Sequence, residues 1–382
     1  MVRAGVGLSQ RPGLGAVEEA AEAALAGAQG ADSALVFAAP DETLDPRELL
    51  DAVVGALGTE CVVGATAHGV LGAGRELEGA PALAILAQTG LEARAFLIPD
   101  LRDAGAGVGD EIRGQLGGPA REEDLLVLLP DPSSFDPARV LEGVRAALGP
   151  AQVVGAGAAD PVSDRPLQWC GRESLSGALV GMVLRGRRPP RVGVTQACRP
   201  ATGLLTVTRA RGNWVLELEG RPALDLYREV ARGPLSEDLR RAAAFLLVAL
   251  PCDRQEPLRP GGYLVRNVVG FATEQGAFAI PEPVKPGQQL ALALRDPASA
   301  REDLKAMLAD LGARSPALGL YFDCCARGAG FFGVSGLEAA YLESALGPAP
   351  LAGMFGSCEI GPVGGVTELL TYTGVLALID QD

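Results

Sequence analysis

The sequence predicts a mixed α/β fold, with mixed sheets built from repeated strand–helix–strand units in two pseudo-symmetric domains. The same order of segments recurs three times, within residues 32–98, 124–194 and 316–379. A chain of 382 residues is long for a single hydrophobic core and has a suitable length for two. Its 48% of hydrophobic and 21% of charged residues are ordinary values for a globular protein, which argues against disorder.

Each of the three segments opens with an apolar run that is typical of a buried strand, at residues 34–38, 125–129 and 317–322. A polar loop follows, and then a helix whose apolar residues recur three or four positions apart. Each helix ends in a Leu-Gly pair, in which the glycine supplies a left-handed cap. These pairs are Leu57-Gly58, Leu148-Gly149 and Leu346-Gly347.

A short strand that ends in a glycine beside small residues comes next, at residues 62–65, 153–156 and 351–354. The strand–helix–strand order predicts parallel pairing with a right-handed crossover. The β-rich runs that follow predict antiparallel additions, so each sheet should be mixed.

We also expect a fourth, divergent copy of the unit, which begins with the apolar run at residues 243–250. It continues through β-rich sequence into a helix near residues 298–311. Four half-units would then form two domains, residues 1–200 and 201–382, with the boundary just after Cys198-Arg199-Pro200.

Charge and composition exclude several classes of partner. The net charge of −14, with no basic stripe, disfavours nucleic acid and anionic membrane surfaces. The N-terminus carries no apolar signal segment, and the longest apolar run, residues 242–250, is far short of the ~20 residues that span a bilayer. Seven cysteines without a secretion signal indicate reduced thiols and a cytoplasmic compartment.

Metal and cofactor motifs are missing from the sequence. His68 is the single histidine, and the adjacent Cys324 and Cys325 lack the spacing of a zinc site. The sequence contains neither a phosphate-binding P-loop nor a G-x-S-x-G nucleophile elbow. We therefore expect no metal and no cofactor.

Three segments at strand ends are candidates for binding or chemistry. Residues 64–72 and 353–362 occupy matching places in the first and last repeats, and their glycines would let the backbone approach a ligand closely. Asp323-Cys324-Cys325-Ala326-Arg327-Gly328 directly follows a strand, so that a thiol beside a guanidinium could be nucleophilic. The alternative is that these loops are tight turns and the cysteines are small buried groups.

The same residues resemble the FIST family. The Cys324-x-x-Arg327-Gly328 element, the 353–362 loop and Thr371-Tyr372-Thr373-Gly374-Val375 look like the C-terminal FIST domain. Residues 63–69 look like an element of the N-terminal domain, although Ala65 stands where a cysteine is common and Val70 where a glutamate is common. The resemblance implies a small-ligand-binding sensory module of bacterial signalling proteins and some F-box proteins, with amino acids as suggested ligands. Since the chain ends at Asp382 without room for an output domain, the signal would pass to a partner in trans.

We therefore expect a small-molecule-binding signal-transduction module without catalytic residues of its own. Glu359 could hold an amino group, and Arg327 or Arg266 could hold a carboxylate. Two alternatives stay open: a thiol-dependent enzyme for acyl or amide groups, with Cys324, Cys325 or Cys358 as nucleophile, and a non-catalytic scaffold. The expected ligand-binding residues are Thr66, His68, Arg266, Cys324, Arg327, Ser357, Cys358, Glu359 and Tyr372.

Overall fold

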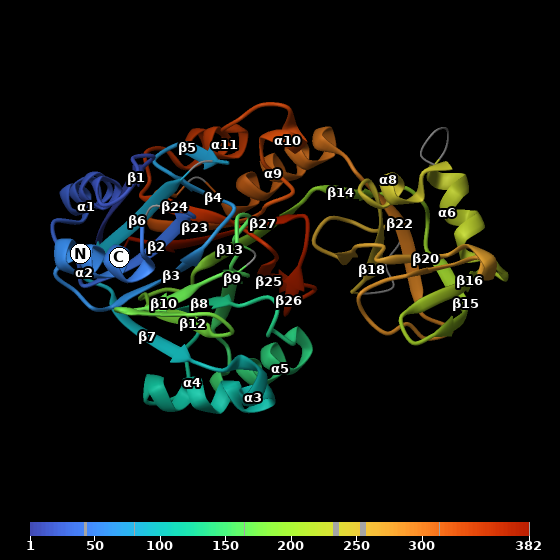
Figure 1. The fold of residues 1–382 in the computed structure, drawn as a ribbon, viewed down its shortest axis with the longest axis horizontal. Coiled ribbons are helices and arrows are strands. Elements are labelled where there is room, and N and C mark those ends of the chain that lie inside the picture. Colours follow the sequence, from blue (N-terminus) through green and yellow to red (C-terminus); the bar gives the residue numbers. More distant parts are fainter. Residues whose placement is uncertain are drawn as a thin grey trace.

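The computed structural model describes residues 1–41, 44–79, 81–163, 165–231, 237–252, 257–312 and 314–381. Within these residues it confirms the mixed α/β class, with three six-stranded mixed sheets and one nine-stranded sheet (Figure 1). The three mixed sheets form a large body, and the fourth belongs to a smaller body at one end. Among the described residues, no helix is both long and apolar enough to cross a membrane.

The first repeat runs through eight elements at the N-terminus. They are β1 (Arg3–Ser9), α1 (Gly15–Ala28), β2 (Ser33–Ala39), α2 (Pro46–Leu57), β3 (Val62–Thr66), β4 (Gly69–Gly72), β5 (Arg75–Glu78) and β6 (Ala82–Thr89). Strand β2 pairs parallel with β3 and antiparallel with β6, and β6 pairs antiparallel with β1. Asp45 accepts a hydrogen bond from the Arg47 amide and thereby caps α2, whose buried face carries the apolar residues seen in the sequence.

The second and third repeats have the same order of strands and the same pairing directions. The second consists of β7 (Glu92–Ile98), α3 (Leu101–Ala104), α4 (Val108–Leu116), β8 (Asp124–Pro130), α5 (Pro137–Leu148), β9 (Gln152–Ala156), β10 (Gln168–Cys170), β11 (Glu173–Leu175) and β12 (Leu179–Arg185). The third consists of β13 (Arg191–Gln196), α9 (Pro297–Leu311), β23 (Pro316–Cys324), α10 (Ala329–Phe332), α11 (Leu337–Leu346), β24 (Leu351–Gly356), β25 (Glu359–Val363), β26 (Val366–Leu370) and β27 (Thr373–Asp380). The expected repetition of strand–helix–strand units is confirmed.

Each repeat gives a hairpin to the sheet of another repeat. The β4–β5 hairpin pairs with β24 of the third repeat, β10–β11 pairs with β3 of the first, and β25–β26 pairs with β9 of the second. The three sheets are therefore linked in a cycle, and their inner faces share one apolar core in which Phe37 and Phe322 meet edge to face. The helices of each repeat cover the outer face of its sheet (Figure 1).

A glycine sits at the same place in all three repeats because a side chain there would collide with the neighbouring strand. A Cβ atom on Gly64 would lie 1.7 Å from the Val36 carbonyl oxygen. The corresponding distances are 1.9 Å from Gly155 to the Leu128 oxygen and 1.8 Å from Gly353 to the Tyr321 oxygen. Gly64 and Gly353, whose loops the sequence suggested for close approach to a ligand, serve the close approach of two strands, as does Gly155.

The expected fourth copy of the unit is wrong. Strand β18 (Leu246–Pro251) pairs antiparallel with both of its neighbours, β19 and β22, so this region lacks the parallel pair of the unit. An apolar run of this length fits either kind of sheet, which is why the sequence pattern misleads. The predicted helix near residues 298–311 does form, as α9, but it belongs to the third repeat.

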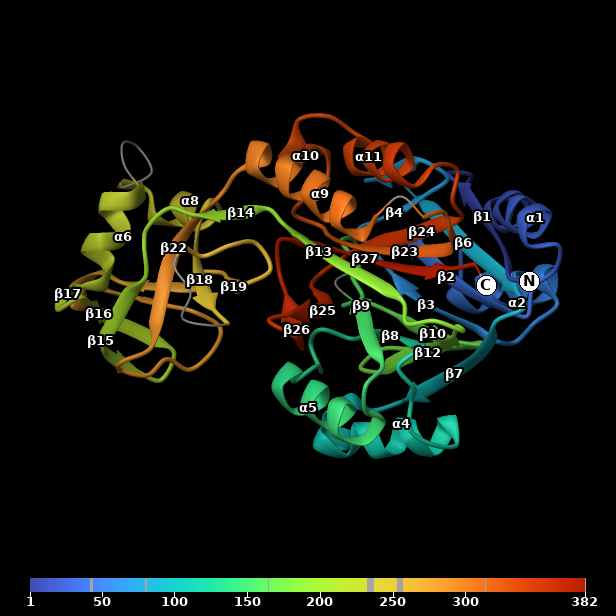
Figure 2. The same ribbon diagram turned by 180° about the vertical axis from the view of Figure 1, so that it is seen from behind.

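The smaller body is inserted between β13 and α9 (Figure 2). Its elements are β14 (Cys198–Pro200), β15 (Leu205–Arg211), β16 (Trp214–Leu218), β17 (Arg221–Pro222), α6 (Ala223–Ala231), α8 (Leu239–Ala243), β18, β19 (Tyr263–Arg266), β20 (Gly270–Ala272), β21 (Ala277–Ala279) and β22 (Gln289–Arg295). The boundary expected near residue 200 falls at β14, where the chain enters this body. The division into residues 1–200 and 201–382 stays a prediction.

Candidate functional site

The carboxyl ends of the parallel strands in the three repeats meet at the centre of the large body. Three backbone hydrogen bonds of 2.9 Å join these strand ends. The His68 amide donates to the carbonyl oxygen of Phe355. The Ala159 amide donates to the carbonyl oxygen of Thr66, and the Gly157 amide to that of Cys358. The loops that begin at Thr66 and at Ser357 therefore lie at one common edge, together with a loop from the second repeat. In α/β folds such edges are the usual place for ligands.

A cavity of about 390 Å³ opens at this edge beside the first repeat. Its walls come from the carboxyl ends of β2 and β3, the N-terminal ends of α1 and α2, and the loop that leads into β10. Most of the lining is apolar, including Ala38, Leu44, Leu49, Leu83, Leu167 and Trp169. The volume lies within the range of about 300–1,000 Å³ that is usual for small-molecule sites.

Thr66 is the residue of the predicted set that lines this cavity. Its amide donates to the Leu167 carbonyl oxygen over 2.9 Å, and its Oγ1 accepts a hydrogen bond of 2.9 Å from the Leu167 amide. The wall is therefore held by a contact between the first repeat and the segment before β10 of the second.

Four charged side chains also line the cavity, namely Arg11, Asp41, Asp160 and Arg165. Asp41 accepts a hydrogen bond from the Gly13 amide over 2.7 Å, and Arg11 forms an exposed ion pair with Glu19. Burial raises the pKa of Asp160, but hydrogen bonds from the Ser163 and Val162 amides and the Ser163 hydroxyl outweigh it, and the net shift is downward. Arg165 is exposed and has no hydrogen bond or ion pair to any described residue.

His68 is half-buried next to this cavity but is not one of its lining residues. Burial lowers the pKa of the His68 imidazole, and the nearby Asp160 carboxylate partly opposes that shift. The imidazole is therefore favoured in its neutral form.

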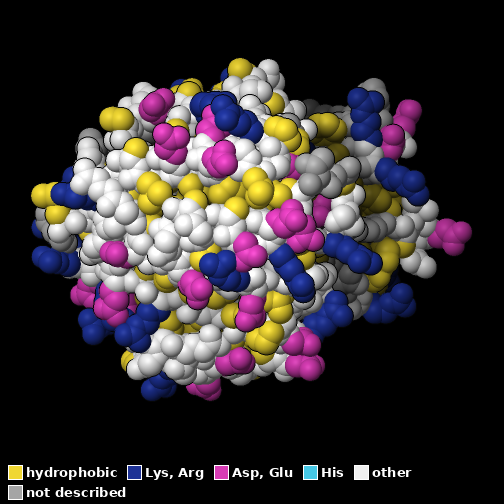
Figure 3. All heavy atoms as spheres, turned by 60° about the vertical axis from the view of Figure 1, so that its left-hand side comes forward, with side chains coloured by type: hydrophobic (Ala, Val, Ile, Leu, Met, Phe, Trp, Pro, Cys, Tyr) yellow, Lys and Arg dark blue, Asp and Glu magenta, His cyan; other side chains and the backbone are white. Residues whose placement is uncertain are grey.

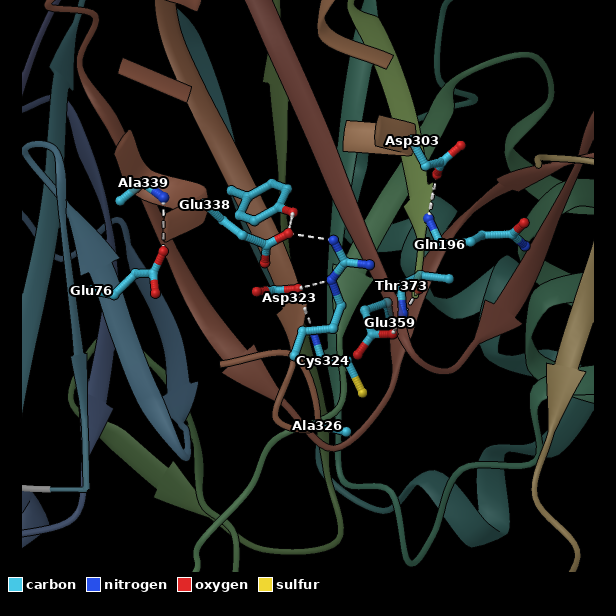
Figure 4. Close-up of polar contacts among 12 residues, drawn as sticks. Glu76, Gln196, Asp303, Asp323, Cys324, Ala326, Glu338, Ala339, Glu359 and Thr373 are labelled. Carbon is cyan, nitrogen blue, oxygen red and sulfur yellow. Dashed lines mark hydrogen bonds and ion pairs between the residues drawn. The ribbon is translucent and has the colours of Figure 1, made fainter. Parts of the chain in front are cut away.

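A second cluster of predicted residues is buried at the end of β23 (Figure 4). The fully buried Arg327 guanidinium pairs with Glu338 and, through Nε, with Asp323 Oδ1 at 3.0 Å. Burial, followed by the charge of Glu338, raises the pKa of Asp323 well above its usual value. The guanidinium is thus held by carboxylates of the protein itself.

Glu359 is also fully buried, and its Oε2 accepts hydrogen bonds from the Thr373 amide (3.2 Å) and hydroxyl (2.7 Å). Burial raises the pKa of Glu359 well above its usual value, and the neighbouring Cys324 adds to the shift. The Cys324 sulfur lies beside the Glu359 carboxyl group in Figure 4. A neutral carboxylic acid is therefore favoured at this position.

The cysteines of this cluster differ in exposure and acidity. Burial raises the pKa of Cys358 to about 12, and a hydrogen bond to Cys325 together with burial raises that of Cys324. The same hydrogen bond lowers the pKa of Cys325, whose side chain is exposed. The polar neighbour that favours the Cys325 thiolate is thus the Cys324 thiol, whereas the sequence suggested Arg327.

The other three predicted residues bond to nearby parts of the protein. The Ser357 hydroxyl donates to the Ala158 carbonyl oxygen over 3.1 Å. Tyr372 has a left-handed backbone (φ 60°) and packs against the Arg295 guanidinium. Arg266 pairs with Glu282 at 2.7 Å and also donates to the Leu369 carbonyl oxygen of β26, so it links the smaller body to the large one.

The structure therefore brings six predicted residues together around the ends of β23 and β24, and places Thr66 alone in the cavity wall. Sequence reasoning missed Arg11, Arg165 and Trp169. Trp169 lies on β10 of the exchanged hairpin and Arg165 in the loop before it, and the sequence has no local signal for this exchange. Within the described residues, no group of three or more His, Cys, Asp or Glu side chains is arranged to hold a metal ion.

Comparisons with known proteins place the chain in one family. The FIST N domain matches residues 32–221 and the FIST C domain matches residues 223–362. An uncharacterized protein of Mycobacterium tuberculosis is 33% identical over 99% of both chains, and one of Mycobacterium bovis is 32% identical over the full length of both.

Among solved structures, a cyanuric acid hydrolase from A. caulinodans is similar with a TM-score of 0.29 and 12% identity, over 48% of this chain and 71% of that chain. A likeness this weak supports no conclusion about the fold or the activity. The two domain matches, by contrast, span most of the chain. The chain belongs to the FIST family, whose domains generally serve as sensory domains in signal transduction.

Proposed function

We propose that the protein is a cytoplasmic sensory module that binds a small molecule in the cavity beside the first repeat and signals to a partner protein in trans. The observation that carries the proposal is this cavity of about 390 Å³, with apolar walls and charged groups on its lining. A mostly apolar pocket with a few polar groups is the usual form of a small-molecule site.

The lining favours a ligand with an apolar body and a carboxylate. Arg165 is an exposed guanidinium without a partner among the described residues, and two parallel hydrogen bonds from such a group suit a carboxylate. Asp160 on the same lining would suit an ammonium group. An amino acid with an apolar side chain, or a related small metabolite, meets these requirements.

At the corresponding edges of the other two repeats, carboxylates of the protein itself accept hydrogen bonds from backbone amides. In the third repeat, Glu76 accepts hydrogen bonds from the Gly336 and Ala339 amides at the start of α11. In the second repeat, the buried Asp131 carboxylate accepts from the Ser133 and Gly177 amides. At the edge of the first repeat, the cavity leaves room for a ligand.

A thermal-shift screen tests the proposal. The panel would contain amino acids with branched or aromatic side chains and short carboxylic acids, each beside the matching alcohol. We expect at least one carboxylate to raise the melting temperature, because a ligand that binds only the native state stabilises that state. The matching alcohol should have no effect. Arg165→Ala should abolish the shift, whereas the control Arg188→Ala, at another exposed arginine, should preserve it. A screen without any shift would favour the scaffold function.

A thiol-dependent enzyme is the second candidate, and it is favoured by the exposed Cys325 with its lowered pKa. A catalytic thiolate would release nitrophenol from an activated ester in a burst equal to the protein concentration. Cys325→Ser should remove this burst if the thiol is the nucleophile. Equal release by the variant and the wild type would exclude Cys325 as the nucleophile.

A further inference from the structure

Two adjacent thiols stand at the carboxyl end of β23, and just one of them reaches the surface. Cys324 is buried with 5% of its area exposed, and Cys325, the next residue, is exposed. A hydrogen bond between the two thiols raises the pKa of Cys324 and lowers that of Cys325. The pair therefore combines an accessible thiol with a protected one on consecutive residues.

The surroundings of the two thiols assign them different roles. The Cys324 sulfur lies beside the buried Glu359 carboxyl group, and the hydrogen bond with Cys325 together with burial raises the pKa of Cys324. The hydrogen bond with Cys324 lowers the pKa of Cys325, and it outweighs burial and the nearby Glu359 and Asp323, which oppose the shift. Cys325 is thus the better nucleophile, and Cys324 is in place to react second.

We propose that Cys325 and Cys324 form a redox-active dithiol that a hydroperoxide oxidises to a disulfide. The Cys325 thiolate attacks one peroxide oxygen, the O–O bond breaks, and the leaving oxygen takes up a proton to depart as an alcohol or water. The Cys325 sulfur is then a sulfenic acid. Cys324 sulfur attacks it, the S–S bond forms, and the S–O bond breaks as water leaves with the Cys324 proton. The two electrons lost by the thiols reduce the peroxide.

This disulfide would be strained and easily reduced again. Consecutive Cα atoms lie about 3.8 Å apart, whereas disulfides usually join Cα atoms about 4.4–6.8 Å apart. The strain would act on two backbone hydrogen bonds of this segment. The Cys325 amide donates to the Gly356 carbonyl oxygen over 3.0 Å, and the Arg327 amide donates to the Cys324 carbonyl oxygen over 2.8 Å. Oxidation would therefore loosen the contact of β23 with the end of β24 and with the loop that begins at Ser357.

Intact-mass measurement of the full chain after mild hydrogen peroxide treatment tests the dithiol. We expect the wild type to lose about 2 Da, the two thiol hydrogens, and to regain them with dithiothreitol. Peptide mapping should place the bond between Cys324 and Cys325. Cys325→Ser should abolish this loss of mass, and the control Cys252→Ser, at another exposed cysteine, should leave it unchanged.

The Cys324→Ser variant tests the order of the steps. Dimedone, which traps sulfenic acids, should label Cys325 in this variant and add nothing at Cys252. Circular dichroism of each variant checks that it is folded. The proposal would be overturned by sulfinic acid on Cys325 without any disulfide in the wild type. Oxidation of Cys325 that is no faster than that of Cys252 would overturn it as well.

Discussion

Thr66 and Leu167 exchange two hydrogen bonds across the wall of the cavity, one from each amide, and both measure 2.9 Å. Thr66 ends the parallel pair of the first repeat, whereas Leu167 leads into the hairpin that the second repeat contributes. The candidate ligand site is thus formed by two repeats, and its wall depends on their contact.

The Thr66 hydroxyl should contribute to stability through this contact. Thr66→Val keeps the shape of the side chain but leaves the Leu167 amide without its acceptor, so we expect a loss of about 1–2 kcal/mol in the free energy of unfolding. Urea denaturation measures it. Thr367→Val is the matched control, because the Thr367 hydroxyl has no hydrogen bond to a described residue. An equal effect of both changes would contradict the role of the Thr66 hydroxyl.

The buried Arg327 should be essential for stability. Arg327→Met leaves Asp323 and Glu338 without their counter-charge, and removal of one partner from a buried ion pair costs about 3–5 kcal/mol. Denaturant unfolding measures the change, with Arg221→Met as control, because its ion pair with Glu229 is exposed and should contribute little to stability. The double variant Arg327→Met with Glu338→Leu should recover part of the loss. If Arg327→Met were as stable as the wild type, the buried ion pairs of Arg327 would not contribute to stability.

Glu76 should make stability depend on pH. Burial raises its pKa to about 7 in the folded protein, above the ordinary value, while hydrogen bonds from the Ala339 and Gly336 amides oppose the shift. The folded state therefore binds more protons than the unfolded state between about pH 4.5 and 7. This contribution is complete below the unfolded pKa and is lost as the pH rises through about 7.

Urea denaturation across this pH range should show the contribution as a difference between variants. Wild-type stability should fall more steeply than that of Glu76→Gln, by on the order of 1–2 kcal/mol once solvent screening is allowed for. Glu122→Gln, at an exposed glutamate, should follow the wild type. A Glu76→Gln profile parallel to the wild-type profile would show that Glu76 does not titrate in this way.

The glycine at the end of β3 should tolerate no side chain. Gly64→Ala would place Cβ against the Val36 carbonyl oxygen and the Trp169 indole, so we expect a loss of at least about 3 kcal/mol. Gly55→Ala, in α2, meets nothing within 4 Å and should stabilise the protein by about 0.5–1 kcal/mol. Thermal unfolding of both variants measures these effects. A neutral Gly64→Ala change would contradict the close approach of β2 and β3.

The sequence was sufficient to predict the repeated unit, because each part of it has a local signal. Apolar runs mark β2, β8 and β23, and the Leu-Gly pairs mark the ends of α2, α5 and α11. The exchange of hairpins has no such signal, since β4, β10 and β25 look like continuations of their own repeats. The pairing of strands from different repeats depends on the packing of the shared core, and the residues next to each hairpin in the sequence do not determine it.

The candidate site was predicted only in part for the same reason. The edge at which Thr66 and Ser357 lie follows from the symmetry of the repeats. The burial of Arg327 and Glu359 does not follow from that symmetry. The sequence near a polar loop residue does not indicate which distant segments will pack over its side chain. On the face shown in Figure 3, acidic and basic side chains are interspersed among hydrophobic ones.

Fluorescence of Trp169 tests the proposed ligand site most directly. The chain has two tryptophans, and Trp169 lines the cavity whereas Trp214 lies on β16 in the smaller body. In a Trp214→Phe background, titration with the carboxylates of the screen should change the Trp169 emission to saturation for at least one of them. Adding Arg165→Ala should remove this response. A compound that raises the melting temperature without any change in Trp169 emission would place its site elsewhere and contradict the account.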